Sequence, residues 1–208
     1  MNLLTQFIYF DVGGVLLLDY SGTNKWVEMK RDLGVSADLD SKFDDIWKRY
    51  RSQICIDCDV DTLVPLFEKE VGITIPEKYS MLADFVNRFE VNKNIWKIAQ
   101  KAKEKYRVGL LTNQFPRMLD LVQENKLIPD IEWDVVIDSS VVGYQKPEDD
   151  IFEIAEKATN HDPESILLID NGSKNLEGAK KRGWNTLLYD PQNLVDSNNK
   201  IIDVLMLK

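Results

Sequence analysis

Apolar residues along this chain follow two different periods, and the change between the periods divides the sequence. An apolar, aromatic run at residues 7–10 stops at Asp11 and is followed by Gly13 and Gly14, which predicts a buried strand opening into a tight turn. Beyond it, apolar residues recur at helical spacing in four successive stripes. The stripes are Trp26, Met29 and Leu33; Phe43, Ile46, Trp47 and Tyr50; Leu63, Leu66, Phe67 and Val71; and Leu82, Phe85, Val86 and Phe89. No clear strand separates them, so residues 18–91 are predicted to form an all-helical subdomain.

After Asn94 the pattern changes to an alternation of strands and helices. Apolar runs at 108–111, 135–137, 166–169 and 186–189 predict strands, and the segments 95–105, 148–158 and 174–182, with another after Pro116, predict helices. Strands that are apolar throughout are typical of a parallel sheet covered on both faces. We therefore expect an α/β fold with a doubly wound, Rossmann-like parallel sheet. Residues 1–17 and 92–208 would form this core, and residues 18–91 would be its helical insertion.

Composition narrows the functional classes. With 208 residues, 44% of them hydrophobic, the chain can form one α/β domain and a small subdomain. Its formal net charge of -9 argues against nucleic acid as a partner. The first ten residues lack a basic leader, and no apolar run approaches the roughly 20 residues that span a bilayer. We expect a cytoplasmic protein without membrane contacts, as a monomer or homodimer.

The two cysteines, Cys55 and Cys58, have the spacing of a redox or metal motif. A structural zinc site normally needs four ligands, and the chain has no second cysteine pair and a single histidine, His161. We interpret the two cysteines as ordinary thiols.

Chemically capable side chains follow the predicted strands at their carboxyl ends, where ligands bind in such sheets. Asp11 follows the first strand, Thr112 and Asn113 follow the second, and Asp170 and Asn171 follow the strand at 166–169. A loop between the last two adds Lys146 before Pro147. A carboxylate can act as a covalent nucleophile, a hydroxyl and a lysine can hold a transferring phosphoryl group, and further oxygen ligands can bind Mg²⁺.

These four motifs, in this order and across nearly the whole chain, closely resemble the haloacid dehalogenase superfamily. The opening Asp11-Val-Gly13-Gly14-Val15, together with Lys146-Pro147-Glu148, resembles its glucose-1-phosphatase-like subgroup of sugar-phosphate phosphatases, and the insertion matches its helical cap. The resemblance implies a Mg²⁺-dependent phosphatase of a small phosphorylated metabolite. It implies that Asp11 and Lys146 are catalytic, that Gly13, Thr112, Asn113 and Lys146 bind phosphate, and that Asp11, Gly13, Asp170 and Asn171 hold the metal.

Two positions depart from the superfamily pattern. Phosphatases of this superfamily usually carry a second aspartate, the general acid–base, two residues after the nucleophile, where this chain has Gly13. Asn171 stands where a metal-binding carboxylate is usual. Both departures keep open a catalytically weakened protein that binds phosphate or a partner. A 2-haloacid dehalogenase is a further alternative, although Arg31, the nearest candidate for its cap arginine, gives no convincing match.

Overall fold

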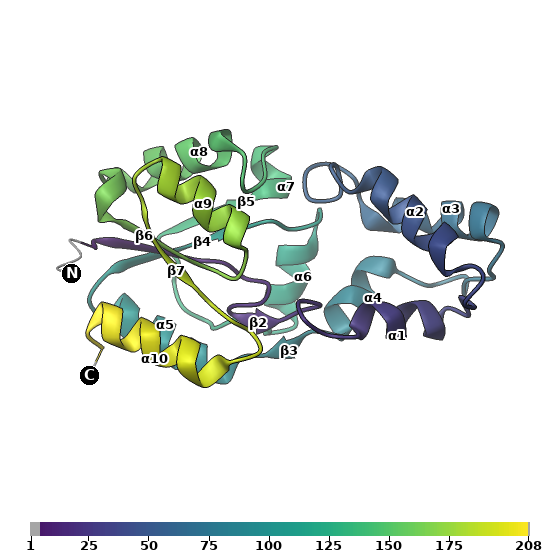
Figure 1. The fold of residues 1–208 in the computed structure, drawn as a ribbon, viewed down its shortest axis with the longest axis horizontal. Coiled ribbons are helices and arrows are strands. Elements are labelled where there is room, and N and C mark those ends of the chain that lie inside the picture. The colour runs from purple at the N-terminus through teal and green to yellow at the C-terminus, as the bar shows by residue number, and fades with distance from the viewer. Residues whose placement is uncertain (1–4, 208) are drawn as a thin grey trace.

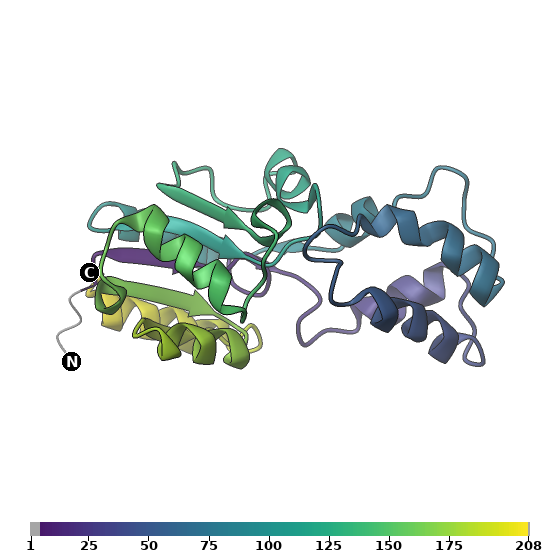
Figure 2. The same ribbon diagram turned by 90° about the horizontal axis from the view of Figure 1, so that it is seen from above.

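A computed structural model describes residues 5–207. Residues 1–4 and 208, which belong to the predicted core, lie outside the described residues, and so does part of the N-terminal segment in which no basic leader was expected. The chain forms two parts (Figure 1), a sheet with its covering helices and a group of helices at one end. Helices α1 to α4 make up that group, and the view from above shows the same division (Figure 2). We call residues 18–91 the helical region.

A five-stranded parallel sheet confirms the predicted fold class, and its strand order is β5-β4-β1-β6-β7. The strands are β1 (Phe7–Phe10), β4 (Arg107–Thr112), β5 (Val135–Asp138), β6 (Ile166–Asp170) and β7 (Asn185–Leu188). Strand β1 is central and its four residues are fully buried. Since the chain leaves the sheet at Phe10, Asp11 comes to lie at the middle of the sheet's carboxyl edge.

Helices cover both faces of this sheet (Figure 1). One face carries α5 (Lys93–Lys103) and α10 (Leu194–Leu205), and the other carries α8 (Asp149–Thr159) and α9 (Ser173–Lys181). Successive residues of β1 point to opposite faces, so Ile8 and Phe10 join one buried cluster while Phe7 and Tyr9 join the other. The remaining short elements of the core are α6 (Met118–Glu124), α7 (Ser139–Val142) and the 3₁₀ turn η3 (Pro163–Ser165).

The helical region follows the predicted stripes, with one difference. Its elements are α1 (Lys25–Asp32), α2 (Asp40–Tyr50), η1 (Val60–Leu63), α3 (Val64–Leu66), η2 (Phe67–Val71) and α4 (Met81–Asn87). The stripe at 63–71 is not one regular helix, because it passes from a 3₁₀ turn through a single α turn that contains Pro65 into a π turn. Pro65 has no backbone N–H, so one of the hydrogen bonds of a regular helix cannot form there.

Short strands flank the helical region where the chain leaves and re-enters the core. Strand β2 (Leu17–Leu18) pairs antiparallel with β3 (Glu90–Val91). Neither strand was expected from the sequence, and helix α10 was not expected either. The pair closes the insertion at its base, close to the predicted limits 18 and 91.

Among the described residues, no helix is long and apolar enough to cross a membrane.

Candidate active site

Three of the predicted site positions come together at the carboxyl edge of the sheet. Asp11 follows β1, and its backbone N–H donates to the carbonyl of Ile169 in β6 at 2.9 Å. Thr112 and Asp170 end the two strands on either side of β1. Parallel neighbours place their carboxyl ends side by side, which is why residues more than 150 positions apart can share one site.

Lys146 joins the two carboxylates. Its Nζ lies 3.1 Å from Oδ1 of Asp11 and 2.5 Å from Oδ2 of Asp170, and it also donates to the carbonyl of Leu111 at 2.7 Å. The side chains of Lys146 and Asp170 are completely buried, and that of Asp11 is 10% exposed. One cation therefore balances two carboxylates, of which Asp11 keeps the only solvent-facing surface among these three.

Burial and the neighbouring charges shift the pKa values of Asp11 and Lys146. Burial raises the pKa of Asp11 to about 7; the charge of Lys146 opposes this shift and that of Asp170 adds to it. Burial by itself would lower the pKa of Lys146, but the two carboxylates outweigh burial and its pKa is raised. The lysine therefore stays charged, and it is the main influence that favours an ionised Asp11.

Thr112 and Asn113, which form the second of the four motifs, supply a hydroxyl and a structural amide. Thr112 is fully buried, and its Oγ1 accepts from Nε2 of Gln114 at 2.8 Å. Asn113 binds the backbone of Lys146 at both ends of its amide: Nδ2 donates to the Lys146 carbonyl at 2.9 Å, and Oδ1 accepts from the Lys146 N–H at 2.8 Å. The side chain of Asn113 thus holds the lysine loop against β4, a contact that the sequence did not reveal.

Asp170 and Asn171 form the fourth motif, and its hydrogen bonds centre on the carboxylate of Asp170. Its Oδ1 accepts from the Gly172 N–H at 2.7 Å and from Nδ2 of Asn175 at 3.1 Å. Asn171 is half-buried and donates from Nδ2 to Oγ of Ser21 at 3.2 Å, so it faces the chain that follows β2. Gly14 has a φ of +74°, and a Cβ added there would lie only 2.0 Å from Nδ2 of Asn171. The left-handed backbone conformation and the close approach of Asn171 therefore both favour glycine at this position.

The donor set at this edge fits Mg²⁺ in kind. Magnesium takes oxygen ligands, usually one or two carboxylates together with waters and substrate phosphate oxygens. Asp11 and Asp170 are the two carboxylates, the amide oxygen of Asn171 is close by in sequence, and Gly13 offers a backbone carbonyl. Within residues 5–207, no group of three or more His, Cys, Asp or Glu side chains is placed to hold a metal by itself. Waters and the oxygens of the substrate's phosphate would complete such a site.

Asp19 is a residue of this site that sequence reasoning missed. Its Oδ2 lies 2.6 Å from where a Cβ on Gly13 would stand, and its Oδ1 accepts from the Ser21 N–H at 2.8 Å. Burial raises the pKa of Asp19, and the hydrogen bonds from Ser21 oppose the shift. In the sequence, the one feature that could have pointed to Asp19 is its position eight residues after Asp11, at the end of the apolar run that follows the turn.

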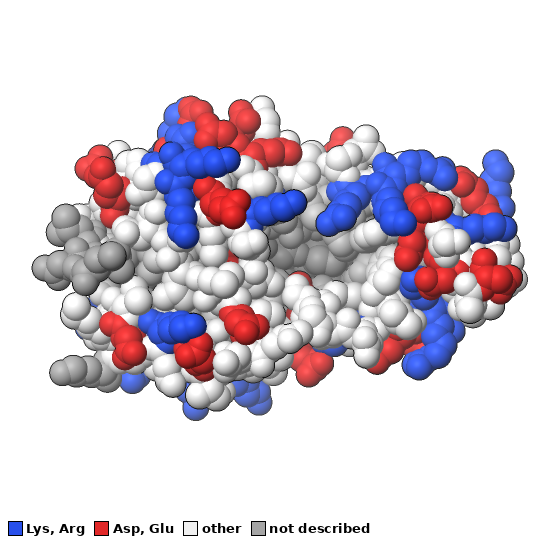
Figure 3. All heavy atoms as spheres, in the orientation of Figure 1, with Lys and Arg blue, Asp and Glu red and all other residues white. Residues whose placement is uncertain are grey.

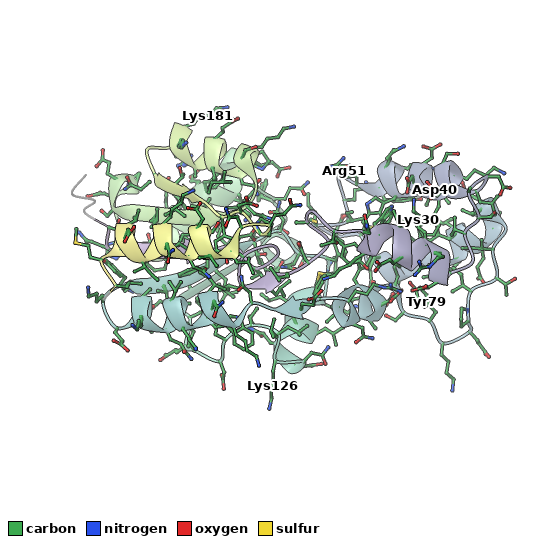
Figure 4. All side chains as sticks on the ribbon, turned by 60° about the horizontal axis from the view of Figure 1, so that its bottom comes forward. Lys30, Asp40, Arg51, Tyr79, Lys126 and Lys181 are labelled. Atoms are coloured by element: carbon green, nitrogen blue, oxygen red, sulfur yellow. The ribbon has the colours of Figure 1, made fainter. Side chains whose placement is uncertain are left out.

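A cavity of about 340 Å³ opens beside Gly13 and Asp19 and reaches into the helical region. Most of its wall is apolar; the lining residues from the helical region are Tyr20, Trp26, Trp47, Phe85 and Phe89. Leu17, Phe115 and Met118 of the core complete the apolar wall, and Asn113 and Gln114 are its polar members besides Asp19. The surface is hollowed between the two parts of the molecule, with lysine and arginine side chains along the rim (Figure 3). Arg51 lies on the side of the helical region that faces the core (Figure 4).

The other sequence candidates do not join the cluster of Asp11, Lys146 and Asp170, although Cys55 lies near enough for the charges of Asp11 and Lys146 to act on its thiol. Cys55 and Cys58 are free thiols, and burial raises the pKa of Cys55 to about 12, which agrees with their interpretation as ordinary thiols. Arg31 is exposed on α1 and its nearest charged partner is its neighbour Asp32, at 3.6 Å. It does not line the cavity.

Comparison with known proteins agrees with this fold. A D-ribitol-5-phosphate phosphatase from Bacteroides thetaiotaomicron is 26% identical over 95% of this chain and 97% of its own length. A protein described as a predicted HAD-like family hydrolase, from Porphyromonas gingivalis, matches with a TM-score of 0.75 and 22% identity over 96% of this chain and 98% of its own. An enzyme of the same family from B. thetaiotaomicron, in complex with magnesium and inorganic phosphate, matches with a TM-score of 0.68 and 20% identity, covering 88% and 93%. The model of the haloacid dehalogenase-like hydrolases matches residues 6–183, and this chain is a member of that hydrolase family.

Proposed function

We propose that this protein is a Mg²⁺-dependent phosphatase that hydrolyses the phosphate monoester of a small metabolite through an aspartyl-phosphate on Asp11. The observation that carries the proposal is the buried Lys146, whose Nζ joins Asp11 and Asp170 at the carboxyl edge of the sheet. A lysine in this position favours the ionised form of a buried carboxylate without surrounding it, so one face of Asp11 remains available to a substrate.

Each residue has a role in this reaction. An Oδ of Asp11 attacks the phosphorus, and the bond between phosphorus and the ester oxygen breaks. Lys146 offsets charge on Asp11 and the incoming phosphoryl group. The hydroxyl of Thr112 accepts from Gln114 and keeps its own proton to donate to that group. Asp11, Asp170, Asn171 and the Gly13 carbonyl are the groups that would hold Mg²⁺. When bound, this ion would neutralise phosphate oxygens and help to orient them.

The cavity beside Gly13 and Asp19 would receive the part of the substrate that is not phosphate. Its volume of about 340 Å³ suits a small metabolite, and its aromatic wall suits a group with at least one apolar face. A related protein is named a D-ribitol-5-phosphate phosphatase, which makes sugar and polyol phosphates the first compounds to test. We further propose that the protein acts in the cytoplasm as a monomer or homodimer.

Two alternatives make different predictions. A weakened, phosphate-binding protein would retain phosphate affinity but turn over slowly; it is motivated by Gly13 and Asn171, which replace the usual carboxylates. A 2-haloacid dehalogenase would release halide without Mg²⁺, and the exposed position of Arg31 gives it no support.

The test is a panel of phosphorylated metabolites, with sugar, polyol and aryl phosphates among them, assayed with and without Mg²⁺. We expect at least one compound to be hydrolysed at ordinary enzymatic rates, about 1 to 10³ per second. Asp11→Asn should abolish that turnover while the protein keeps its circular dichroism spectrum. Activity that survives Asp11→Asn refutes the nucleophile assignment. Phosphate binding without turnover of any compound would favour the weakened protein, and metal-free halide release from 2-haloacids would favour the dehalogenase.

A further inference from the structure

The position of Gly13 leaves a gap in the expected chemistry, because a phosphatase of this kind needs a group to protonate the departing oxygen. Glycine has no side chain that could do so. The structure places the Asp19 carboxylate in that space, with Oδ2 at 2.6 Å and Cγ at 3.4 Å from the position that a Cβ of residue 13 would occupy. A carboxylate therefore stands beside the Gly13 backbone although it comes from another position in the chain.

The turn after β1 explains how Asp19 reaches this point. Residue 13 bridges to Leu17, so the chain folds back on itself after Asp11 before it enters β2. Asp19 is the first residue after β2, at the start of the helical region. The Ser21 N–H then fixes one oxygen of its carboxylate at 2.8 Å, which leaves Oδ2 directed towards Gly13.

Other acidic groups near the site are already committed. Asp11 and Asp170 share Lys146. Asp138 accepts from both the N–H and the hydroxyl of Ser140 at 2.8 Å, as the cap of α7. Of the described residues, Asp19 is the only carboxylate that lines the cavity in which the leaving group would sit.

We propose that Asp19 is the general acid–base of this enzyme and replaces the aspartate that is absent at position 13. This inference rests on the proposed phosphatase function. It also assigns a catalytic role to the segment joining the core to the helical region, so that a movement of that region would carry the proton donor with it.

The proposed reaction balances in two steps. As Asp11 forms its bond to phosphorus, the ester oxygen leaves with the electron pair of the broken P–O bond and takes the proton of the Asp19 carboxyl group. The alcohol departs, and Asp19 is left as a carboxylate. A water molecule then gives one proton to Asp19 as its oxygen attacks the phosphorus of the aspartyl-phosphate. The bond between phosphorus and the Asp11 oxygen breaks, its electron pair returns to the Asp11 carboxylate, and inorganic phosphate leaves with Asp19 protonated again.

The experiment compares two leaving groups in Asp19→Asn, a change that keeps the side chain's size. An alkyl phosphate from the active panel needs a proton at its leaving oxygen, so its turnover should fall by about 10²- to 10⁴-fold. The nitrophenolate of p-nitrophenyl phosphate can depart without a proton, but the second step still lacks its base. Rapid mixing of this variant with p-nitrophenyl phosphate should give a stoichiometric burst of nitrophenolate, followed by slow release of phosphate and an accumulated phosphoenzyme.

A relocation of the carboxylate provides the rescue. Gly13→Asp by itself brings two carboxylates into one space and should lower the turnover below that of wild type. Gly13→Asp combined with Asp19→Gly should have a turnover at least tenfold higher than that of Asp19→Gly alone. The matched control is Asp130→Asn, which removes an exposed carboxylate outside the site and should keep wild-type rates. Equal thermal melting of Asp19→Asn and wild type excludes misfolding as the cause.

The outcomes separate this inference from the proposed function. An active wild type whose Asp19→Asn variant still hydrolyses the alkyl phosphate within about threefold overturns the role of Asp19 alone. Equal losses on both substrates without a burst also overturn it, because a merely structural role would slow the first step for both. A wild type that is inactive on every phosphate ester overturns the phosphatase function, and this inference with it.

Discussion

Replacing Lys146 by methionine tests whether one buried cation really holds the site together. The change removes the charge and keeps an unbranched side chain of similar length. The side chains of Lys146 and Asp170 are fully buried and that of Asp11 is nearly so. In the variant, water therefore cannot replace the lysine as the hydrogen-bonding partner of the two carboxylates. Removing one partner of a buried ion pair costs about 3–5 kcal/mol of stability. We expect Lys146→Met to lose that much at neutral pH, measured by urea unfolding without Mg²⁺.

The loss should shrink as the solution is acidified. Burial already raises the pKa of Asp11 to about 7, and Lys146 is the main influence that lowers it. Without the lysine, the pKa of Asp11 rises further above its value in the unfolded chain. The variant therefore takes up this proton at a higher pH than wild type does, and it regains stability relative to wild type as the pH falls from there. The difference between variant and wild type should therefore be smaller at about pH 5 than at about pH 8. Asp170→Asn added to Lys146→Met should restore part of the loss, because one unpaired charge is gone.

Lys30 provides a matched control within the same molecule. It is as buried as Lys146, with 3% of each residue exposed, and its Nζ also contacts two carboxylates, at 2.5 Å for Asp40 and 3.0 Å for Asp44 (Figure 4). However, the side chains of these partners are 50% and 29% exposed, so water can replace the lysine. Lys30→Met should cost about 1 kcal/mol or less, the range of solvated pairs. Equal losses for the two lysines, or a loss at Lys146 that does not change with pH, would refute the reasoning.

Three further changes test other parts of the site. Gly14→Ala forces a Cβ to within 2.0 Å of Nδ2 of Asn171 at a φ of +74°, so it should cost more than about 1 kcal/mol in urea unfolding and lower activity; an unchanged midpoint would contradict the close approach. Asn171→Asp adds a carboxylate beside Ser21, whose hydroxyl can donate to it, and should lower the Mg²⁺ concentration for half-maximal activity, whereas an unchanged value would remove Asn171 from the metal site. Arg117→Gln removes contacts from Nη2 to Asp59 and Asp61, both at 2.7–2.8 Å, that join the core to the helical region. Since the arginine is half exposed, stability should fall by no more than about 1 kcal/mol while KM rises, and an unchanged KM would show that this contact does not set the cavity.

Local patterns in the sequence were sufficient for the layers of this fold. The middle of each of the strands β1, β4 and β6 is apolar because both faces of the sheet are buried under helices, so each appears as an apolar run that is followed by a polar residue. Those ends were enough to group Asp11, Thr112 and Asp170, since parallel strands bring their carboxyl ends together.

Short or irregular elements gave no comparable pattern. Strands β2 and β3 have two residues each, too few for any alternation to show. After Leu194 and Val195, helix α10 continues with a run of Asp, Ser and Asn residues, and its deeply buried apolar residues, Ile201 and Leu205, come only in its second half. Its helical period is therefore weak, and its place against α5 depends on packing rather than on local preference.

Only the tertiary structure decided which side chains share the site. The sequence shows that residue 13 is a glycine, and from that fact alone the acid–base group is missing. It cannot show that the chain folds back through the Gly13–Leu17 bridge and brings Asp19 into the empty space. Likewise, nothing in its sequence neighbourhood pairs Asn113 with the backbone of Lys146, 33 positions away. Periodicity reports which face of an element is buried, because burial acts on each element separately, whereas contacts between distant positions arise only when the elements pack.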